Sequence, residues 1–169
     1  VFTKDAIKPT VESIRFNGDT NMVYVIFNEL CMTSAVQGNG IVFKEDATSE
    51  NMHTLSLGGT VSVNPTEFSI TMEVLISKAD MNALKRRYPL LSSLETTYVM
   101  LLSNFVTDVY GNPIQPFSGF VTTWFPDVTP PVLVAYTLDM ALDFIQLTFD
   151  ESVNIDSISL PEITLQTTN

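Results

Sequence analysis

The sequence has few of the residues that hold small disulfide-linked or metal-linked domains together. Its 169 residues include one cysteine and one histidine. A single cysteine, Cys31, excludes a disulfide within the chain and a cysteine-rich zinc site. It is therefore either a small buried apolar residue or half of an intermolecular disulfide. Since hydrophobic residues make up 45% of the chain, an apolar core can hold the fold together instead.

Positive charge is also scarce. Eight Lys and Arg stand against 19 Asp and Glu, which gives a formal net charge of -11. Nucleic acids and anionic membranes are bound through clustered cations, so neither is expected as a partner. The only cationic cluster is Lys85, Arg86 and Arg87. It is either a solvated helix face or a docking point for an acidic surface on a neighbouring copy.

Long apolar runs and catalytic motifs are missing as well. No run approaches the roughly 20 residues that span a bilayer, so no membrane insertion is expected. The chain begins without the features of a signal peptide, which predicts a start inside a longer precursor. His53 has no second histidine for a metal site, and Asp150 and Glu151 are neighbours in an expected strand, so their side chains point to opposite faces. We therefore expect no enzymatic activity.

What the sequence does contain is an internal repeat. When Pro9 is aligned with Pro131, an offset of 122 residues (131 − 9), apolar positions coincide with period 2 over some forty residues without a gap. Phe27 then falls on Phe149, and Glu29 falls on Glu151. The pattern predicts the tail of one unit at residues 1–8, a complete unit at residues 9–128, and a partial second copy at residues 129–169.

Each copy reads as a series of short strands. The pattern predicts an Ig-like antiparallel β-sandwich of all-β class, because seven or eight short strands are separated by turn signals over about 120 residues. Residues 22–29 are strongly apolar at both odd and even positions, which predicts a strand that is buried on both faces or lies within a sandwich. The stretches on either side of Gly58-Gly59 are expected to form a hairpin. The expected strands are residues 11–16, 22–29, 41–44, 53–57, 60–63, 68–74, 97–103 and 119–124.

Local signals add a turn, a helix and a linker. Asn17-Gly18 is expected to supply the positive φ angles of a tight turn. Ser77 reads as the N-cap of one short inserted helix over residues 77–88, which Pro89 ends. The stretch PDVTPP at residues 126–131 is expected to be a stiff linker, because prolines fix φ and restrict the residue before them.

Three stretches carry a resemblance to a known family. They are DVTPP at residues 127–131, LTFDESV at residues 147–153 and TDVYGN at residues 107–112. They resemble the DTTPP, LTFSEPV and TDxAGN signatures of the Ig-like repeats in large cell-surface and adhesin proteins of bacteria and some protists. The resemblance implies an extracellular or cell-surface rod of many such units. The chain departs from it at Lys8-Pro9 and in FNELC at residues 27–31.

The partial copy leads to the main functional hypothesis. A few strands alone would expose ladder groups and an apolar face. We therefore expect a structural repeat of a filament or stalk that self-assembles, its second copy completed by further chain or by a neighbouring subunit. The alternative is an adhesin module that binds glycan or protein through loops at residues 47–51 or 90–95. The residues expected to carry assembly are Pro131, Leu133, Ile145, Leu147, Phe149, Ile163 and Leu165.

Calcium and sugars complete the expectations. Carboxylates often bind Ca²⁺ where extracellular domains meet, so Asp127, Asp108, Glu29 and Glu151 are candidate Ca²⁺ ligands, the alternative being solvated carboxylates at turns. No Asn-x-Ser/Thr site with a permitted x occurs, because Pro65 excludes Asn64. O-linked sugars have candidates at Thr48, Ser49, Thr96 and Thr167.

Overall fold

The chain divides into two compact units. The computed structural model describes residues 3–56, 60–62 and 64–166, and it separates unit 1, Val1–Thr129, from unit 2, Pro130–Asn169. The short 3-10 turns are η1 (Thr33–Ala35), η2 (Gly38–Gly40), η3 (Leu94–Thr96), η4 (Ile155–Ser157) and η5 (Leu160–Glu162). The strands of unit 1 are β1 (Val11–Asn17), β2 (Met22–Met32), β3 (Ile41–Lys44), β4 (Met52–Thr54), β5 (Thr60–Ser62), β6 (Phe68–Ile76), β7 (Tyr98–Leu101), β8 (Phe117–Phe120) and β9 (Thr123–Phe125).

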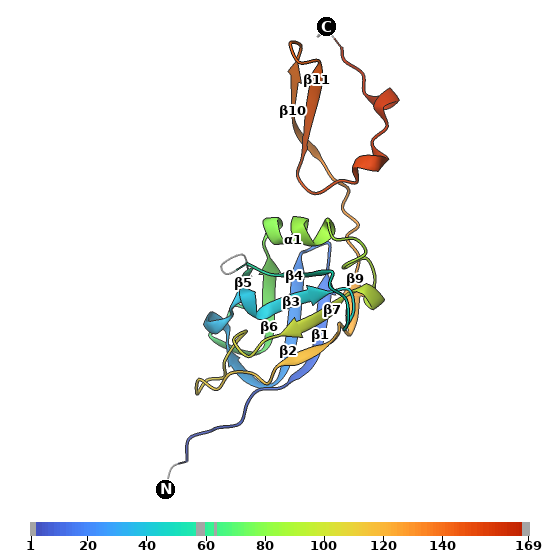
Figure 1. Ribbon diagram of the computed structural model, residues 1–169. Helices are drawn as coiled ribbons and strands as arrows, with labels where there is room; N and C mark the ends of the chain where they lie inside the picture. Colours follow the sequence, from blue (N-terminus) through green and yellow to red (C-terminus); the bar gives the residue numbers. More distant parts are fainter. Residues whose placement is uncertain (1–2, 57–59, 63, 167–169) are drawn as a thin grey trace. The chain divides into compact units, whose positions relative to one another are not determined.

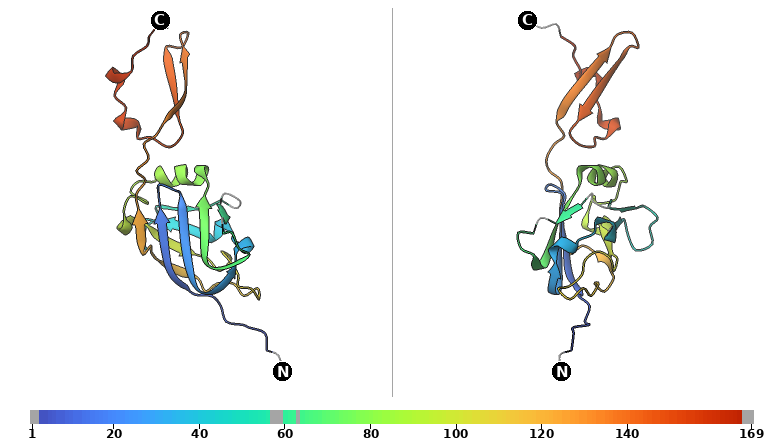
Figure 2. Two further views of the ribbon diagram at one scale, coloured as in Figure 1. Left: turned by 180° about the vertical axis from the view of Figure 1, so that it is seen from behind. Right: turned by 90° about the vertical axis from the view of Figure 1, so that its left-hand side faces the viewer.

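Unit 1 is a β-sandwich, as the sequence predicts. One sheet has the strand order β5-β6-β2-β1-β9, and the other has the order β4-β3-β7-β8. The four-stranded sheet is nearer the viewer in Figure 1, and the five-stranded sheet is nearer in the left view of Figure 2. The expected all-β sandwich with one short helix is therefore confirmed.

The core lies between the two sheets. Alternate residues of the strands point inward, and the Phe16 and Phe43 rings meet edge to face across the sandwich, with centroids 5.9 Å apart. In β2 the inward residues are buried while Tyr24 and Ile26 are partly exposed, so of the two expected environments the strand has that of a sandwich and is not buried on both faces. The sequence does not show this alternation, because the outward residues Met22, Tyr24 and Ile26 are also apolar. Fully buried core residues include Ile14, Val23, Val25, Phe27, Ile41, Met72, Val74, Val99 and Leu101.

The predicted helix is α1, Lys78–Lys85, which covers one end of the sandwich in Figure 1. Ser77 is its N-cap, because the Asp80 amide donates to Ser77 Oγ at 3.1 Å. Met81 and Leu84 point into the core and are 3% and 0% exposed. The helix is shorter than the expected 77–88 because the chain leaves the helical conformation ahead of Pro89.

Two strand pairings differ from the expectation. β4 pairs with β3 and β5 pairs with β6, so the stretches on either side of Gly58-Gly59 belong to different sheets and do not form a hairpin. The connection itself, residues 57–59, lies outside the described residues. In addition, β9 pairs with β1 in parallel, so unit 1 is not purely antiparallel. Pairing partners depend on contacts distant in sequence, which local turn signals do not report.

The turn after β1 forms where expected, but the residue with a positive φ angle is neither Asn17 nor Gly18. The positive φ lies at Asn21, at 57°, whereas Gly18 is required for close packing. The Gly18 amide donates to the Phe125 carbonyl at 2.9 Å, and a Cβ on Gly18 would come within 2.9 Å of the Asp127 nitrogen. Glycine therefore lets the chain leaving β9 lie against the turn.

Unit 2 contains a two-stranded sheet of its own, made of β10 (Leu133–Asp139) and β11 (Phe144–Phe149). Its geometry reproduces the β1–β2 hairpin at the same offset of 122 residues. Val11 pairs with Phe27 and Leu133 pairs with Phe149, and both hairpins have an irregularity after this first pair. The turns also match, because Asp143 has a positive φ of 51° at the position of Asn21.

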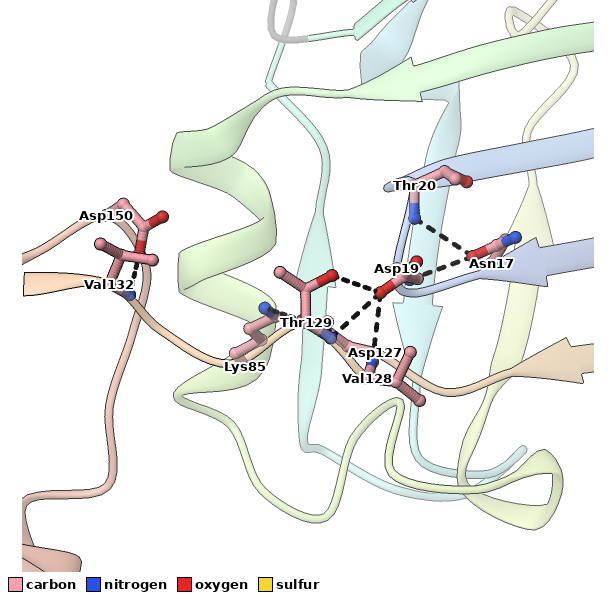
Figure 3. Close-up of polar contacts among 9 residues, drawn as sticks. All are labelled: Asn17, Asp19, Thr20, Lys85, Asp127, Val128, Thr129, Val132 and Asp150. Atoms are coloured by element: carbon pink, nitrogen blue, oxygen red, sulfur yellow. Dashed lines mark hydrogen bonds and ion pairs between the residues drawn. The ribbon is translucent and has the colours of Figure 1, made fainter.

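Side-chain hydrogen bonds recur with the same offset. The Thr10 amide donates to Asn28 Oδ1 at 2.8 Å, and the Val132 amide donates to Asp150 Oδ1 at 2.7 Å. Both acceptors are the residue after the last Phe of the hairpin, and an oxygen at Oδ1 is common to Asn and Asp. The two copies of the repeated hairpin sequence therefore form the same local structure. Figure 3 shows the bond in unit 2.

Candidate functional site

The inner face of the β10–β11 hairpin is less buried than the equivalent face of unit 1. Ile145, Leu147 and Phe149 alternate on one face of β11 and are only half-buried. Their counterparts at the offset of 122 are Val23, Val25 and Phe27, which are 0%, 0% and 1% exposed. The same side-chain face that forms the core of unit 1 is therefore open in unit 2.

A groove runs along this open face. It has a volume of about 310 Å³ and is bordered by the hairpin on one side and by the chain around η5 on the other. Three predicted assembly residues line it, namely Ile145, Ile163 and Leu165. Leu138 and Leu160 also line it, at 42% and 72% exposed, and were not among the predicted residues. The repeat alignment contained the signal for Leu138, because it falls on the buried Phe16.

The remaining assembly candidates divide into two groups. Leu147 and Phe149 share the inner face of β11 with Ile145. Leu133 is 46% exposed at the start of β10, and Pro131 is exposed before that strand begins. The structure therefore gathers the six apolar candidates in one hairpin and its following segment, and leaves Pro131 in the linker.

The outer edge of β11 is also open. In unit 1 the corresponding edge of β2 pairs with β6 over most of its length, whereas β11 pairs with β10 alone within residues 130–166. Unpaired edge strands are usually protected by charge, proline or a covering element. The β11 sequence, FIQLTF, has neither a charge nor a proline.

A cluster of carboxylates lies at a different place, in unit 1. Asp5, Glu29 and Asp108 each bring an oxygen within 4.8 Å of the others. Asp108 follows β7 and is fully buried, and its carboxylate accepts bonds from the Tyr110 amide at 2.8 Å and the Asn112 amide at 2.7 Å. Three clustered carboxylates offer oxygen ligands of the kind that Ca²⁺ prefers.

The cluster is electrostatically unbalanced. Burial, together with repulsion from Asp5 and Asp108, raises the pKa of Glu29. Its Oε1 is buried and has no hydrogen-bond partner among the described residues. Burial also raises the pKa of Asp108, but hydrogen bonds from Asn112 and Tyr110 outweigh it, so the net shift is downward. Glu29 is therefore the carboxylate with the least compensation.

The structure brings together only two of the four predicted calcium ligands. Glu29 and Asp108 lie in the cluster, while Glu151 belongs to unit 2 and Asp127 forms an ion pair with Lys85. The third member is Asp5, which sequence reasoning missed. Asp5 precedes Asp127 by the same offset of 122. The prediction therefore named the right position of the repeat but took it from the wrong copy.

The linker after β9 is tied to unit 1 by the turn between β1 and β2. Asp19 Oδ1 accepts bonds from the Val128 amide at 3.2 Å, the Thr129 amide at 3.1 Å and Thr129 Oγ1 at 2.7 Å (Figure 3). The Thr129 hydroxyl and these amides lower the pKa of Asp19. Lys85 of α1 holds Asp127 from the other side. No sequence signal pairs Asp19 with residues so far along the chain.

The three residues of the basic cluster have different surroundings. Lys85 is engaged by Asp127 within unit 1. Arg86 and Arg87 are exposed, and docking of an acidic surface on them stays a prediction.

The single cysteine is settled by burial. Cys31 is 0% exposed, and burial raises the pKa of its thiol to about 12. A buried thiol with so high a pKa does not reach or attack another chain. The intermolecular disulfide is therefore wrong for the folded unit, and Cys31 serves as a small core residue.

The single histidine has a partner that spacing did not reveal. His53 Nε2 lies 3.0 Å from Asp80 Oδ1, and Ser56 Oγ donates to the same oxygen at 2.7 Å. Asp80 is 3% exposed, so this network ties β4 to the first turn of α1. Ser56 and His53 both contact the carboxylate, and no hydrogen bond between them is found among the described residues. His53 and Ser56 therefore each hold the Asp80 carboxylate in place.

Some side chains in the predicted glycosylation sites and ligand-binding loops form contacts within the chain. Thr48 Oγ1 donates to Asp46, and Thr96 Oγ1 accepts from the Ser93 amide. Leu90 and Leu91, in the second predicted ligand loop, are 3% and 8% exposed. Thr167 lies outside the described residues. O-glycosylation of Thr48, Ser49, Thr96 or Thr167 stays a prediction.

Among the described residues, none of the helices is long and apolar enough to cross a membrane. Comparison with protein-family models, with curated proteins and with solved structures found no match.

Proposed function

We propose that this chain is a non-catalytic structural segment of an extracellular or cell-surface filament or stalk, built from tandem Ig-like sandwich repeats. The observation that carries the proposal is the recurrence of one hairpin, with the same pairing register and the same irregularity, at an offset of 122 residues. An accidental likeness between two hairpins would not extend to all of these details.

The recurrence continues beyond the paired strands. In both copies the residue at the end of the first strand, Asn17 or Asp139, accepts two amides of the following turn through Oδ1. The 3-10 turns η1 and η2 of unit 1 also have counterparts in η4 and η5 at the offset of 122. These details support unit 2 as the opening part of a second sandwich.

The open face supports self-association as the activity of the chain. A sheet of two strands is marginal in water unless other elements cover its apolar face. Unit 2 leaves Leu138, Leu160 and Leu165 between 42% and 72% exposed. We propose that further strands, from additional chain or from a neighbouring molecule, cover them as the remaining strands of unit 1 cover Phe16 and Phe43.

The proposal is tested by the association state of the full chain. Sedimentation velocity over a wide concentration range is expected to show reversible growth into oligomers, and negative-stain images of the concentrated protein are expected to show linear particles. Because strand pairing and apolar contact would hold them, the oligomers are expected to persist in EDTA. A monodisperse monomer at every concentration would contradict assembly by this chain.

One observation favours a second proposal, that unit 1 binds a ligand as an adhesin module. A groove of about 320 Å³ is lined by Arg15, Asn17, Tyr24 and Phe125, and the Arg15 guanidinium lies 5.7 Å from the centre of the Tyr24 ring. Aromatic rings beside a cation and an amide suit glycan or peptide recognition. Screening on a glycan array, with Tyr24→Ala as the control, distinguishes this proposal from assembly.

A further inference from the structure

We infer that the free edge of β11 is an acceptor for one antiparallel strand with the chemistry of β6, supplied by another copy of this repeat. The inference rests on the proposed function, because it takes unit 2 as a second copy of the sandwich. It goes further by naming the strand that binds and the register in which it lies.

Unit 1 shows what covers this edge when the sandwich is complete. There β6 runs antiparallel to β2, with Val23 opposite Val74, Tyr24 opposite Glu73 and Val25 opposite Met72. Met72 and Val74 are both 0% exposed, so the inner face of β6 lies in the core. The ladder and the apolar contacts are therefore made by the same strand.

The offset of 122 transfers this register to unit 2. Ile145 would then lie opposite a Val74 equivalent, Gln146 opposite a Glu73 equivalent, and Leu147 opposite a Met72 equivalent. The alternation agrees in phase, because Ile145 and Leu147 face inward and Gln146 faces outward. A shift by one residue would place apolar side chains on the polar face, so the register is specified.

The chemistry of the edge favours a strand over other occupants. β11 is uncharged, and its neighbouring groove of about 310 Å³ is lined mainly by apolar residues. Unpaired backbone groups beside an apolar groove are the two requirements for binding by strand addition, in which the ladder gives affinity and alternate side chains give specificity.

The experiment titrates the full chain with a fluorescent peptide of residues 67–76, EFSITMEVLI, carrying a solubilising tag. Anisotropy is expected to show saturable binding. A peptide with Met72→Asp and Val74→Asp, changed on the inner face, is expected to bind at least about tenfold more weakly, because it would bury two charges. The matched control has Thr71→Asp and Leu75→Asp, which adds the same charge on the outer face, and it is expected to bind within about threefold of the parent.

The acceptor is tested by a second matched pair. Leu147→Asp in the chain is expected to abolish peptide binding, whereas Thr148→Asp, on the outer face of the same strand, is expected to retain it. Trp124, the only tryptophan, lies in β9, and its fluorescence shows whether unit 1 remains folded in both variants. Amide exchange is expected to show new protection within β11 when the peptide is bound.

The outcomes separate the two proposals. Equal binding of both charged peptides, or protection outside β11, would overturn the acceptor. Oligomers that form without being displaced by the parent peptide would also overturn it, and would point to edge-to-edge pairing of hairpins while leaving the filament proposal intact. Peptide binding by a chain that stays monomeric would retain the acceptor and contradict assembly.

Discussion

The hairpins β1–β2 and β10–β11 have the same backbone pairing and opposite surroundings. Phe16, at the end of the first hairpin, is 2% exposed, whereas its counterpart Leu138 is 42% exposed. The irregularity after the first pair, the positive φ in the turn and the bond to Asn28 or Asp150 are present in both. The comparison teaches that the hairpin geometry is a local property, while burial of its face requires strands from elsewhere in the fold.

The largest expected difference between the hairpins lies in their last aromatic residue. Phe27→Ala is expected to destabilise unit 1 by about 3–5 kcal/mol, because it removes a buried ring and leaves a cavity. Phe149→Ala is expected to leave the unfolding of unit 1 unchanged within about 0.5 kcal/mol. Urea unfolding followed by Trp124 fluorescence measures both. A similar loss from the two variants would mean that unit 2 contributes to the stability of unit 1.

An intermediate effect is expected at Asp80, which helps to hold α1 over unit 1. Burial raises the pKa of Asp80, but bonds from His53, Ser56 and Ser77 outweigh it, so the folded pKa lies below its ordinary value. This stability is present above the unfolded pKa and is lost as pH falls through the folded pKa. Asp80→Asn is expected to cost about 1.5–3 kcal/mol at neutral pH, since a buried charged acceptor is lost.

The pH profile provides the control for Asp80. Unfolding of the wild type between neutral and acidic pH is expected to show a steeper loss of stability than unfolding of Asp80→Asn. Equal slopes for the two proteins would assign the acid sensitivity to other carboxylates, of which Asp108 is the first candidate because its pKa is also lowered.

The smallest effect concerns Glu29, whose pKa is raised. A raised folded pKa means that ionised Glu29 destabilises unit 1 at neutral pH and that stability is regained as pH falls toward that pKa. Glu29→Gln is therefore expected to stabilise the metal-free protein, by less than about 1 kcal/mol because the residue is partly exposed. Thermal unfolding at neutral pH measures this gain.

Calcium sharpens the same measurement. Millimolar Ca²⁺ is expected to raise the Tm of the wild type more than that of Glu29→Gln, because a ligand that binds only the folded state stabilises it. Glu151→Gln, in unit 2, is the matched control and is expected to respond as the wild type does. An equal response of all three proteins would exclude the Asp5, Glu29 and Asp108 cluster as a calcium site.

The sequence predicted those elements whose signals come from neighbouring residues. The strand alternation, the Ser77 cap of α1 and the linker near Pro131 each depend on residues a few positions apart, and the repeat supplied a second reading of the same signals. It did not reach the assignment of β4 and β5 to different sheets, the contact of Gly18 with the chain after β9, or the bond from Thr129 to Asp19. These join residues far apart in sequence, and no short-range pattern encodes them.

The same division applies to the candidate sites. By itself the sequence determined which side chains of β11 share a face, because the period of a strand is two and apolar positions follow it. Only the tertiary structure decided that this face is open, that Asp5 rather than Asp127 completes the carboxylate cluster, and that Lys85 is already paired. Periodicity fixes the direction of a side chain, but what it meets depends on which distant strands pack against it.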